Sequence, residues 1–151
     1  MIIRYNLEID EYRHPVMVAE QTVPYETQMN SAEIIVKMLN DCFRMQYQAE
    51  EKVYLIALDH RMQTLGVFEV AHGQASRCRI TCREIFIRAV AAGAESIVIA
   101  HNHTSGQIEP SEEDKIFCQQ ISEAGQLLCI PLTDFLIVGD GYCSFKEERL
   151  L

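Results

Sequence analysis

The apolar residues of this chain fall into short runs of strand length, and this feature constrains the fold most. Two such runs are Val53 to Leu58 and Leu65 to Val70, and a third, Ser96 to Ala100, is rich in β-branched residues. None approaches the roughly 20 residues of a membrane span. The 151 residues are enough for one ordinary domain. We therefore expect a single domain, residues 1–151, built on buried strands and without a membrane span.

Helical segments are mixed with these extended runs. Ser31 is the expected N-cap of a first helix, a second helix is predicted over 83–92 and stops at Gly93, and a third runs from Ser111 to about Gly125. Strands are predicted at 3–9, 16–23, 52–58, 64–71, 96–100, 127–132, 135–138 and 142–145. The first two of these strands form an expected N-terminal hairpin. Because helices and strands intermix without a regular βαβ alternation, we predict an α/β fold of the α+β type, with a mixed sheet flanked by helices.

Charge and cysteine usage restrict the partners and the compartment. The chain has 13 basic and 22 acidic residues, a net charge of −9, which disfavours binding to a nucleic-acid backbone. Six cysteines, at 42, 78, 82, 118, 129 and 143, include no Cys-x-x-Cys pair, and Cys118 and Cys129 sit in apolar segments. The first residues do not resemble a signal peptide. These features predict reduced thiols in a cytoplasmic protein.

The segment from His101 to Asp114 carries the candidate chemistry. Residues i and i+2 of a strand project to the same side, so His101 and His103 can reach one metal ion. Asp114, in the first turn of the next helix, is the candidate third ligand, and two histidines with one carboxylate leave a position open for water, as in catalytic zinc sites. Each piece also has a simpler interpretation. Ser111 and Asp114 have the spacing of a helix capping box, and a His-x-His pair can be ordinary polar residues.

Glu69 is a carboxylate within an otherwise apolar strand. A carboxylate buried without a partner is costly, so Glu69 either faces solvent or faces a cation or a water-lined site. In the second case it is a candidate general base beside a metal. Glu84 is the rival candidate, although its place in a first helical turn is also where a carboxylate favours the helix dipole.

The order Glu69, His101-x-His103, Ser111 and Asp114 resembles the signature of the JAMM (MPN⁺/JAB) metallopeptidases. The surrounding segments narrow the resemblance to the JAB domain of the bacterial RadC family. These segments are Arg83-Glu84-Ile85-Phe86, His101-Asn102-His103-x-Ser105-Gly106, Pro110-Ser111-x-x-Asp114, Ala124-Gly125, Ile137-Val138-Gly139 and Tyr142-x-Ser144-Phe145. The resemblance covers roughly residues 51–145, and residues 1–30 are interpreted as a hairpin extension outside it.

The resemblance implies a largely antiparallel sheet of the JAB/MPN (cytidine-deaminase-like) architecture. It also implies that His101, His103 and Asp114 bind one Zn²⁺ per chain. Glu69 would take a proton from the attacking water and pass it to the leaving amine, and Ser111 would hydrogen-bond the oxyanion of the tetrahedral intermediate. The function expected from it is a zinc-dependent peptidase or isopeptidase acting on a peptide or protein substrate.

Two residues depart from the family pattern: Thr104 replaces a proline, and Phe135 replaces the histidine that follows Asp134. RadC proteins commonly carry an N-terminal helix-hairpin-helix region, and we expect this chain to be a JAB domain without one. Two alternative functions remain. One is a non-catalytic interaction module that retains the fold, and the other is a DNA-repair accessory protein, which the net charge of −9 disfavours.

Overall fold

The computed structural model describes residues 1–25, 28–73 and 80–151. The elements follow in the order β1 (Ile2–Ile9), β2 (Pro15–Val23), α1 (Ala32–Phe43), a 3₁₀ turn (Met45–Tyr47), β3 (Lys52–Leu58), β4 (Thr64–His72), α2 (Cys82–Ala91), β5 (Ser96–Asn102), α3 (Glu112–Leu128), β6 (Leu132–Val138) and β7 (Tyr142–Ser144). The expected N-terminal hairpin is therefore present as β1 and β2.

Among the described residues, the strands form one seven-stranded sheet in the order β2-β1-β4-β3-β5-β6-β7. Four neighbouring pairs are antiparallel: β1/β2, β3/β4, β3/β5 and β6/β7. The β1/β4 and β5/β6 pairs are parallel, and α3 forms the crossover between β5 and β6. This mixed, mostly antiparallel sheet confirms the predicted fold class.

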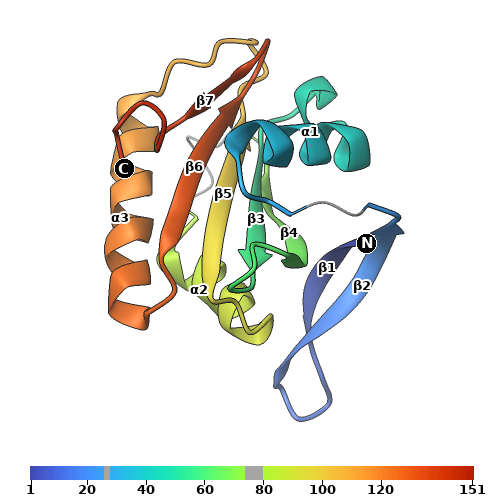
Figure 1. Ribbon diagram of the computed structural model, residues 1–151. Helices are drawn as coiled ribbons and strands as arrows, with labels where there is room; N and C mark the ends of the chain where they lie inside the picture. Colours follow the sequence, from blue (N-terminus) through green and yellow to red (C-terminus); the bar gives the residue numbers. More distant parts are fainter. Residues whose placement is uncertain (26–27, 74–79) are drawn as a thin grey trace.

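Helices cover both faces of the sheet (Figure 1). The helix α1 packs on one face, where Tyr54 and Ile56 of β3 join its apolar side. The helices α2 and α3 pack on the other face, where Val53 and Leu55 of the same strand join Phe135. Because β3 is buried on both faces, its sequence is a continuous apolar run rather than an alternating one.

The helix starts follow the local sequence signals. The side chain of Ser31 accepts a hydrogen bond from the Ile34 backbone N–H at the start of α1. Thr81 and Glu84 form a capping box at the start of α2. Gly93, just after α2, has a φ of +67°, a conformation that glycine adopts without strain. The Ser31 cap and the Gly93 turn were predicted from the sequence, because each depends only on neighbouring residues.

The end of α3 differs from the prediction. The helix continues through Gly125 to Leu128, so the strand predicted over 127–132 is wrong, and β6 begins only at Leu132. Gly125 serves close packing rather than helix termination. A Cβ at this position would lie 2.6 Å from the carbonyl oxygen of Ile130, whose N–H donates to the Gly125 carbonyl at 2.9 Å. Cys129 ends the helix in a left-handed conformation with a φ of +58°.

The cysteines that the structure describes carry free thiols. Cys42 and Cys118 are buried, whereas Cys129 is exposed, so the prediction of core thiols holds for only some of them. Cys78 lies outside the described residues. Within the described part of the chain, no helix has the length and apolar character needed to cross a membrane.

Candidate metal centre

The three predicted metal ligands come from two elements on one side of the sheet. His101 is in β5, in register with Val53 of β3 and Ile137 of β6. His103 follows the end of β5, and its backbone N–H donates to the Val138 carbonyl at 2.9 Å. Asp114 is the third residue of α3. The loop that follows β5 leads directly into α3, so the N-terminus of α3 lies beside the end of β5. This placement brings the candidate ligands together.

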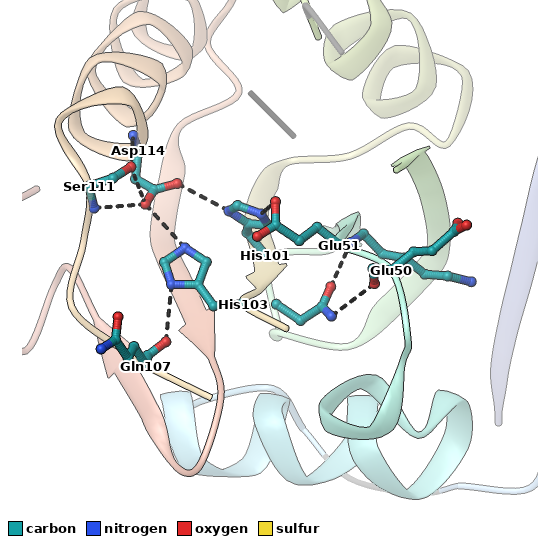
Figure 2. Close-up of polar contacts among 9 residues, drawn as sticks. Glu50, Glu51, His101, His103, Gln107, Ser111 and Asp114 are labelled. Carbon is teal, nitrogen blue, oxygen red and sulfur yellow. Dashed lines mark hydrogen bonds and ion pairs between the residues drawn. The ribbon is translucent and has the colours of Figure 1, made fainter. Parts of the chain in front are cut away.

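Asp114 contacts both imidazole rings (Figure 2). Its Oδ1 lies 3.1 Å from Nδ1 of His101, and its Oδ2 lies 3.3 Å from Nε2 of His103. The two rings are 4.9 Å apart between centroids and nearly perpendicular, at 88°. One candidate ligand atom from each of the three residues can be chosen so that all lie within 4.8 Å of one another. The structure therefore assembles the predicted His-His-Asp cluster.

Two observations indicate that this cluster is suited to binding a metal ion. Tetrahedral ligands at bond lengths of about 2.0–2.1 Å lie about 3.3 Å apart, which matches the separation of His103 Nε2 and Asp114 Oδ2. In addition, Nε2 of His101 is buried and finds no hydrogen-bond partner among the described residues. A buried nitrogen without a partner is costly unless a missing ion or water satisfies it. The donor set of two imidazoles and one carboxylate suits a catalytic zinc ion.

Ser111 fixes the orientation of Asp114. Its backbone N–H and its hydroxyl both donate to Asp114 Oδ2, at 2.8 and 2.7 Å, and the Ser111 Oγ accepts the Asp114 N–H at 3.1 Å. This is the capping box of α3, so the simpler interpretation of the pair is correct and coexists with the ligand cluster. Burial raises the pKa of Asp114, but hydrogen bonds from His101, His103 and Ser111 outweigh it and hold that pKa well below its usual range.

His103 is oriented from its other nitrogen. Its Nδ1 lies 3.0 Å from the carbonyl oxygen of Gln107, in the loop between β5 and α3 (Figure 2). A carbonyl can only accept, so Nδ1 carries the proton, and in the neutral ring Nε2 is left with a free lone pair facing Asp114. The hydrogen bond with Asp114 is the main cause that raises the pKa of His103, against the opposing effect of burial.

A carboxylate that the sequence analysis did not select lies beside this cluster. The Oε2 of Glu51 is 3.7 Å from Nε2 of His101, the buried nitrogen without a hydrogen-bond partner (Figure 2). Glu51 immediately precedes β3, so by strand alternation it shares a face with Val53, the residue paired with His101. Selecting Glu51 from the sequence would have required knowledge of the β3–β5 pairing, which no local sequence pattern reveals.

Glu69, which the sequence analysis proposed as the general base beside the metal, lies on the other face of the sheet from the His101–His103–Asp114 cluster. It is paired with Tyr54 of β3, and both share the side covered by α1, whereas His101 faces α2 and α3. Its Oε2 contacts Lys52 Nζ at 3.0 Å and Arg4 at 3.8 Å, and accepts a hydrogen bond from the Tyr54 hydroxyl at 3.3 Å. The sequence analysis expected Glu69 to face either solvent or a cation or water-lined site. Glu69 does face cations, but these are the basic side chains of Lys52 and Arg4.

The remaining sequence features have structural roles. Glu84, the rival base, accepts hydrogen bonds from the Thr81 hydroxyl and, at 2.8 Å, from its N–H, and these bonds lower its pKa. Phe135 is fully buried and packs edge-on against Phe117, so the departure from histidine fills the core. Thr104 is exposed in the turn that follows His103.

Comparison with known proteins agrees with this geometry. Residues 29–150 match the RadC-like JAB domain family, a range that includes all three candidate ligands and Glu51. The chain belongs to this family. It is 36% identical over 114 residues to a UPF0758 protein of Thermotoga maritima, covering 75% of this chain and 51% of that protein. It is 41% identical over 104 residues to a UPF0758 protein of Thermosynechococcus vestitus, covering 68% of this chain and 42% of that protein.

This RadC-like JAB domain spans about half the length of the curated relatives that it matches. A third relative, a UPF0758 protein of Rubrobacter xylanophilus, is 37% identical over 101 residues, which is 67% of this chain and 44% of that protein. The hairpin β1–β2 precedes the residues matched to the family. It is attached to the JAB domain through the parallel β1/β4 pair and through the contact between Arg4 and Glu69.

Proposed function

We propose that this RadC-like JAB domain is a zinc-dependent hydrolase that cleaves an amide bond, peptide or isopeptide, in a peptide or protein substrate. The observation that carries the proposal is the cluster of His101, His103 and Asp114 with the Glu51 carboxylate beside it. A three-ligand centre with a neighbouring base is the arrangement that hydrolytic zinc sites require. Free thiols at the cysteines that the structure describes are consistent with a cytoplasmic location, which we include in the proposal.

The metal would be held by His101, His103 and Asp114. When bound, zinc supplies a Lewis acid that polarises the substrate carbonyl and lowers the pKa of water toward about 7. The same donor set can also hold Fe²⁺, because two histidines and one carboxylate form the facial triad of non-haem iron proteins. Metal analysis therefore has to identify the ion as well as count it.

Glu51 would act as the general base in place of Glu69. Its side chain is 28% exposed, whereas those of His101 and Asp114 are each 8% exposed, so Glu51 is the member of the group that water reaches most easily. A carboxylate at this position can accept a proton from an attacking water and return it to the leaving amine. The contact with His101 at 3.7 Å keeps this carboxylate within about one water diameter of the cluster.

Ser111 would stabilise the oxyanion of the tetrahedral intermediate. It stands at the N-terminus of α3, where the helix dipole favours negative charge. In the present arrangement its hydroxyl proton is donated to Asp114, so this role requires the hydroxyl to rotate toward the substrate.

The test combines metal analysis with an unbiased cleavage assay. Protein purified without chelators should contain about one zinc ion per chain, measured by plasma mass spectrometry. The purified protein is then incubated with peptides from a digested bacterial lysate, and new termini are identified by mass spectrometry. Cleavage that is present in the wild type and absent in Glu51→Gln supports the proposal. Bound zinc without any cleavage would instead favour the non-catalytic module.

A further inference from the structure

Asn102 stands between the two histidines but contacts a different part of the molecule. It is the last residue of β5 and is only 2% exposed. Its Oδ1 accepts a hydrogen bond from the Lys52 backbone N–H at 2.6 Å, and its Nδ2 donates one to the Glu50 carbonyl at 3.1 Å. One side-chain amide thus holds the backbone on both sides of Glu51.

These contacts extend the pairing between β3 and β5 beyond its last backbone pair. The strand register ends at Val53 opposite His101, so the next position in register places Lys52 opposite Asn102. There the Asn102 side chain replaces the backbone partner that a longer strand would have provided. Figure 2 shows the result, with Glu50 bonded to the neighbouring side-chain amide and Glu51 directed to the His101 ring.

The geometry of the two contacts fixes the direction of the Glu51 side chain. The Glu50 carbonyl belongs to the peptide group before Glu51, and the Lys52 N–H belongs to the peptide group after it. When both planes are held, the φ and ψ of Glu51 are held, and these angles set the direction of its Cα–Cβ bond. A third contact acts on the same segment, because the Gly73 N–H donates to the Glu51 carbonyl at 2.9 Å.

Only an amide side chain of this length provides both functions. It offers one acceptor for the Lys52 N–H and one donor for the Glu50 carbonyl, whereas an aspartate offers acceptors alone. Strand alternation turns Asn102 to the face opposite His101, so its side chain serves the backbone of Glu51 while both neighbouring imidazoles reach Asp114.

We propose that Asn102 is a positioning residue that holds Glu51 beside the His101–His103–Asp114 cluster. This inference rests on the proposed role of Glu51 as the general base. A base displaced by about 1 Å can lose a factor of about 10² in rate even when every reacting group is still present. Asn102 therefore acts on the reaction through Glu51 and contributes no ligand of its own.

The first test does not depend on activity. In the metal-free protein, hydrogen exchange of the Lys52 amide is measured by NMR in the wild type and in Asn102→Ala. We expect protection of this amide in the wild type and exchange at least about tenfold faster in the variant, because the acceptor has been removed. The side-chain amide protons of Asn102 should also be protected in the wild type. Their exchange at the rate of an exposed amide would overturn the inference even if Asn102→Ala does not fold.

The second test separates positioning from general stability. Asn102→Ala should keep its zinc and its KM and lose about 10- to 100-fold in kcat on a peptide that the wild type cleaves. Added to Glu51→Gln, the same substitution should cause no further loss, since two residues that act as a unit are not additive. An equal additional loss in that background would overturn the inference. Asn102→Asp, which keeps the acceptor and loses the donor, should show a smaller decrease than Asn102→Ala.

Asn40→Ala is the matched control. Asn40 also accepts a backbone N–H, that of Gln46 at 2.9 Å, but it lies in α1. Its loss should lower stability and leave kcat unchanged. The two proposals fail in different ways: full activity of Glu51→Gln would overturn the proposed role of Glu51 as the general base and with it the catalytic purpose of Asn102. Unchanged exchange at Lys52 in Asn102→Ala would overturn the positioning role alone.

Discussion

The Oε2 of Glu51 lies 3.7 Å from Nε2 of His101, although β3, β4 and α2 separate the two residues in the chain. The strand pairing of β3 with β5 creates this relationship, and the Asn102 amide holds the backbone on either side of Glu51. As a consequence, Glu51, which precedes β3, lies beside the cluster. Glu69, within β4, instead contacts Lys52 and Arg4.

Exchanging each carboxylate for its amide should separate the roles of Glu51 and Glu69. Both Glu51→Gln and Glu69→Gln should retain zinc, because neither residue belongs to the ligand cluster. Glu51→Gln should lose about 10²–10⁴-fold in kcat, the usual effect of removing a general base, while Glu69→Gln stays active. Metal content and peptide cleavage are measured on the same preparations. The reverse pattern of activities would contradict the assignment of Glu51 as the general base.

Glu69 should matter for stability instead. Its carboxylate contacts Lys52 and Arg4, and it accepts the hydroxyl proton of Tyr54, whose pKa burial and the nearby carboxylate raise to about 12. Glu69→Ala should lower the free energy of unfolding by about 1–3 kcal/mol, because hydrogen bonds to a charged group are lost in a half-buried setting. Urea denaturation measures the change. Tyr54→Phe, which removes one contact, should show a smaller loss.

Removing a ligand should release the metal without unfolding the chain. We expect His103→Ala to lose zinc and keep its circular dichroism spectrum, because the site lies at a strand end and the apolar core forms independently of it. Unfolding of this variant would indicate a structural metal and weaken the hydrolase proposal. Asp114→Ala should also lose zinc, and in addition about 0.5–2 kcal/mol of stability, since it leaves the Ser111 N–H without its capping partner.

The ion pair between His103 and Asp114 should give the metal-free protein a specific pH dependence. The pKa of His103 is raised in the folded state, so its contribution to stability is full below about 6.5 and is lost as the pH rises through the raised value. The pKa of Asp114 is lowered, so its contribution is present above about 3.9 and is lost as the pH falls. Urea denaturation at several pH values should show this contribution between about pH 4 and 6.5, and His103→Ala should lack it.

Zinc binding should have the opposite preference, because the metal requires a neutral His103. The raised pKa of His103 means that protons compete with the metal up to a higher pH than for an ordinary histidine. Zinc affinity measured by competition with a chelator should therefore keep increasing as the pH rises above about 6.5. An affinity that is independent of pH through this range would contradict the assignment of His103 as a ligand.

Gly125→Ala tests the packing that corrected the end of α3. An added Cβ would lie 2.6 Å from the Ile130 carbonyl oxygen, so the segment leading to β6 would have to move. We expect a loss of about 1–3 kcal/mol from this overpacking, measured by urea denaturation. Gly141→Ala is the control, because a Cβ at Gly141 meets no described atom within 4 Å. Equal effects of the two substitutions would show that the contact with Ile130 is unimportant.

The sequence by itself determined the local elements and the residues of the candidate ligand cluster. The apolar run 53–58, the Ser31 cap and the Gly93 turn could be interpreted because each depends on residues close together in the chain. The same holds for His101 and His103, since strand periodicity places residues two apart on one side. Asp114 followed from its place in the first turn of the next helix, which the crossover returns to the end of β5.

Tertiary structure decided which carboxylate stands beside the cluster. Strand periodicity correctly placed Glu69 with Val67, but it could not show which sheet face His101 would occupy, because that depends on the register between separate strands. The end of α3 also depends on tertiary contacts. Gly125 does not end the helix, and its small size instead allows the close approach of the Ile130 carbonyl oxygen. Local propensities act between near neighbours, whereas sheet register and close packing join residues far apart in sequence, and only the folded chain brings Glu51, His101 and Asn102 together.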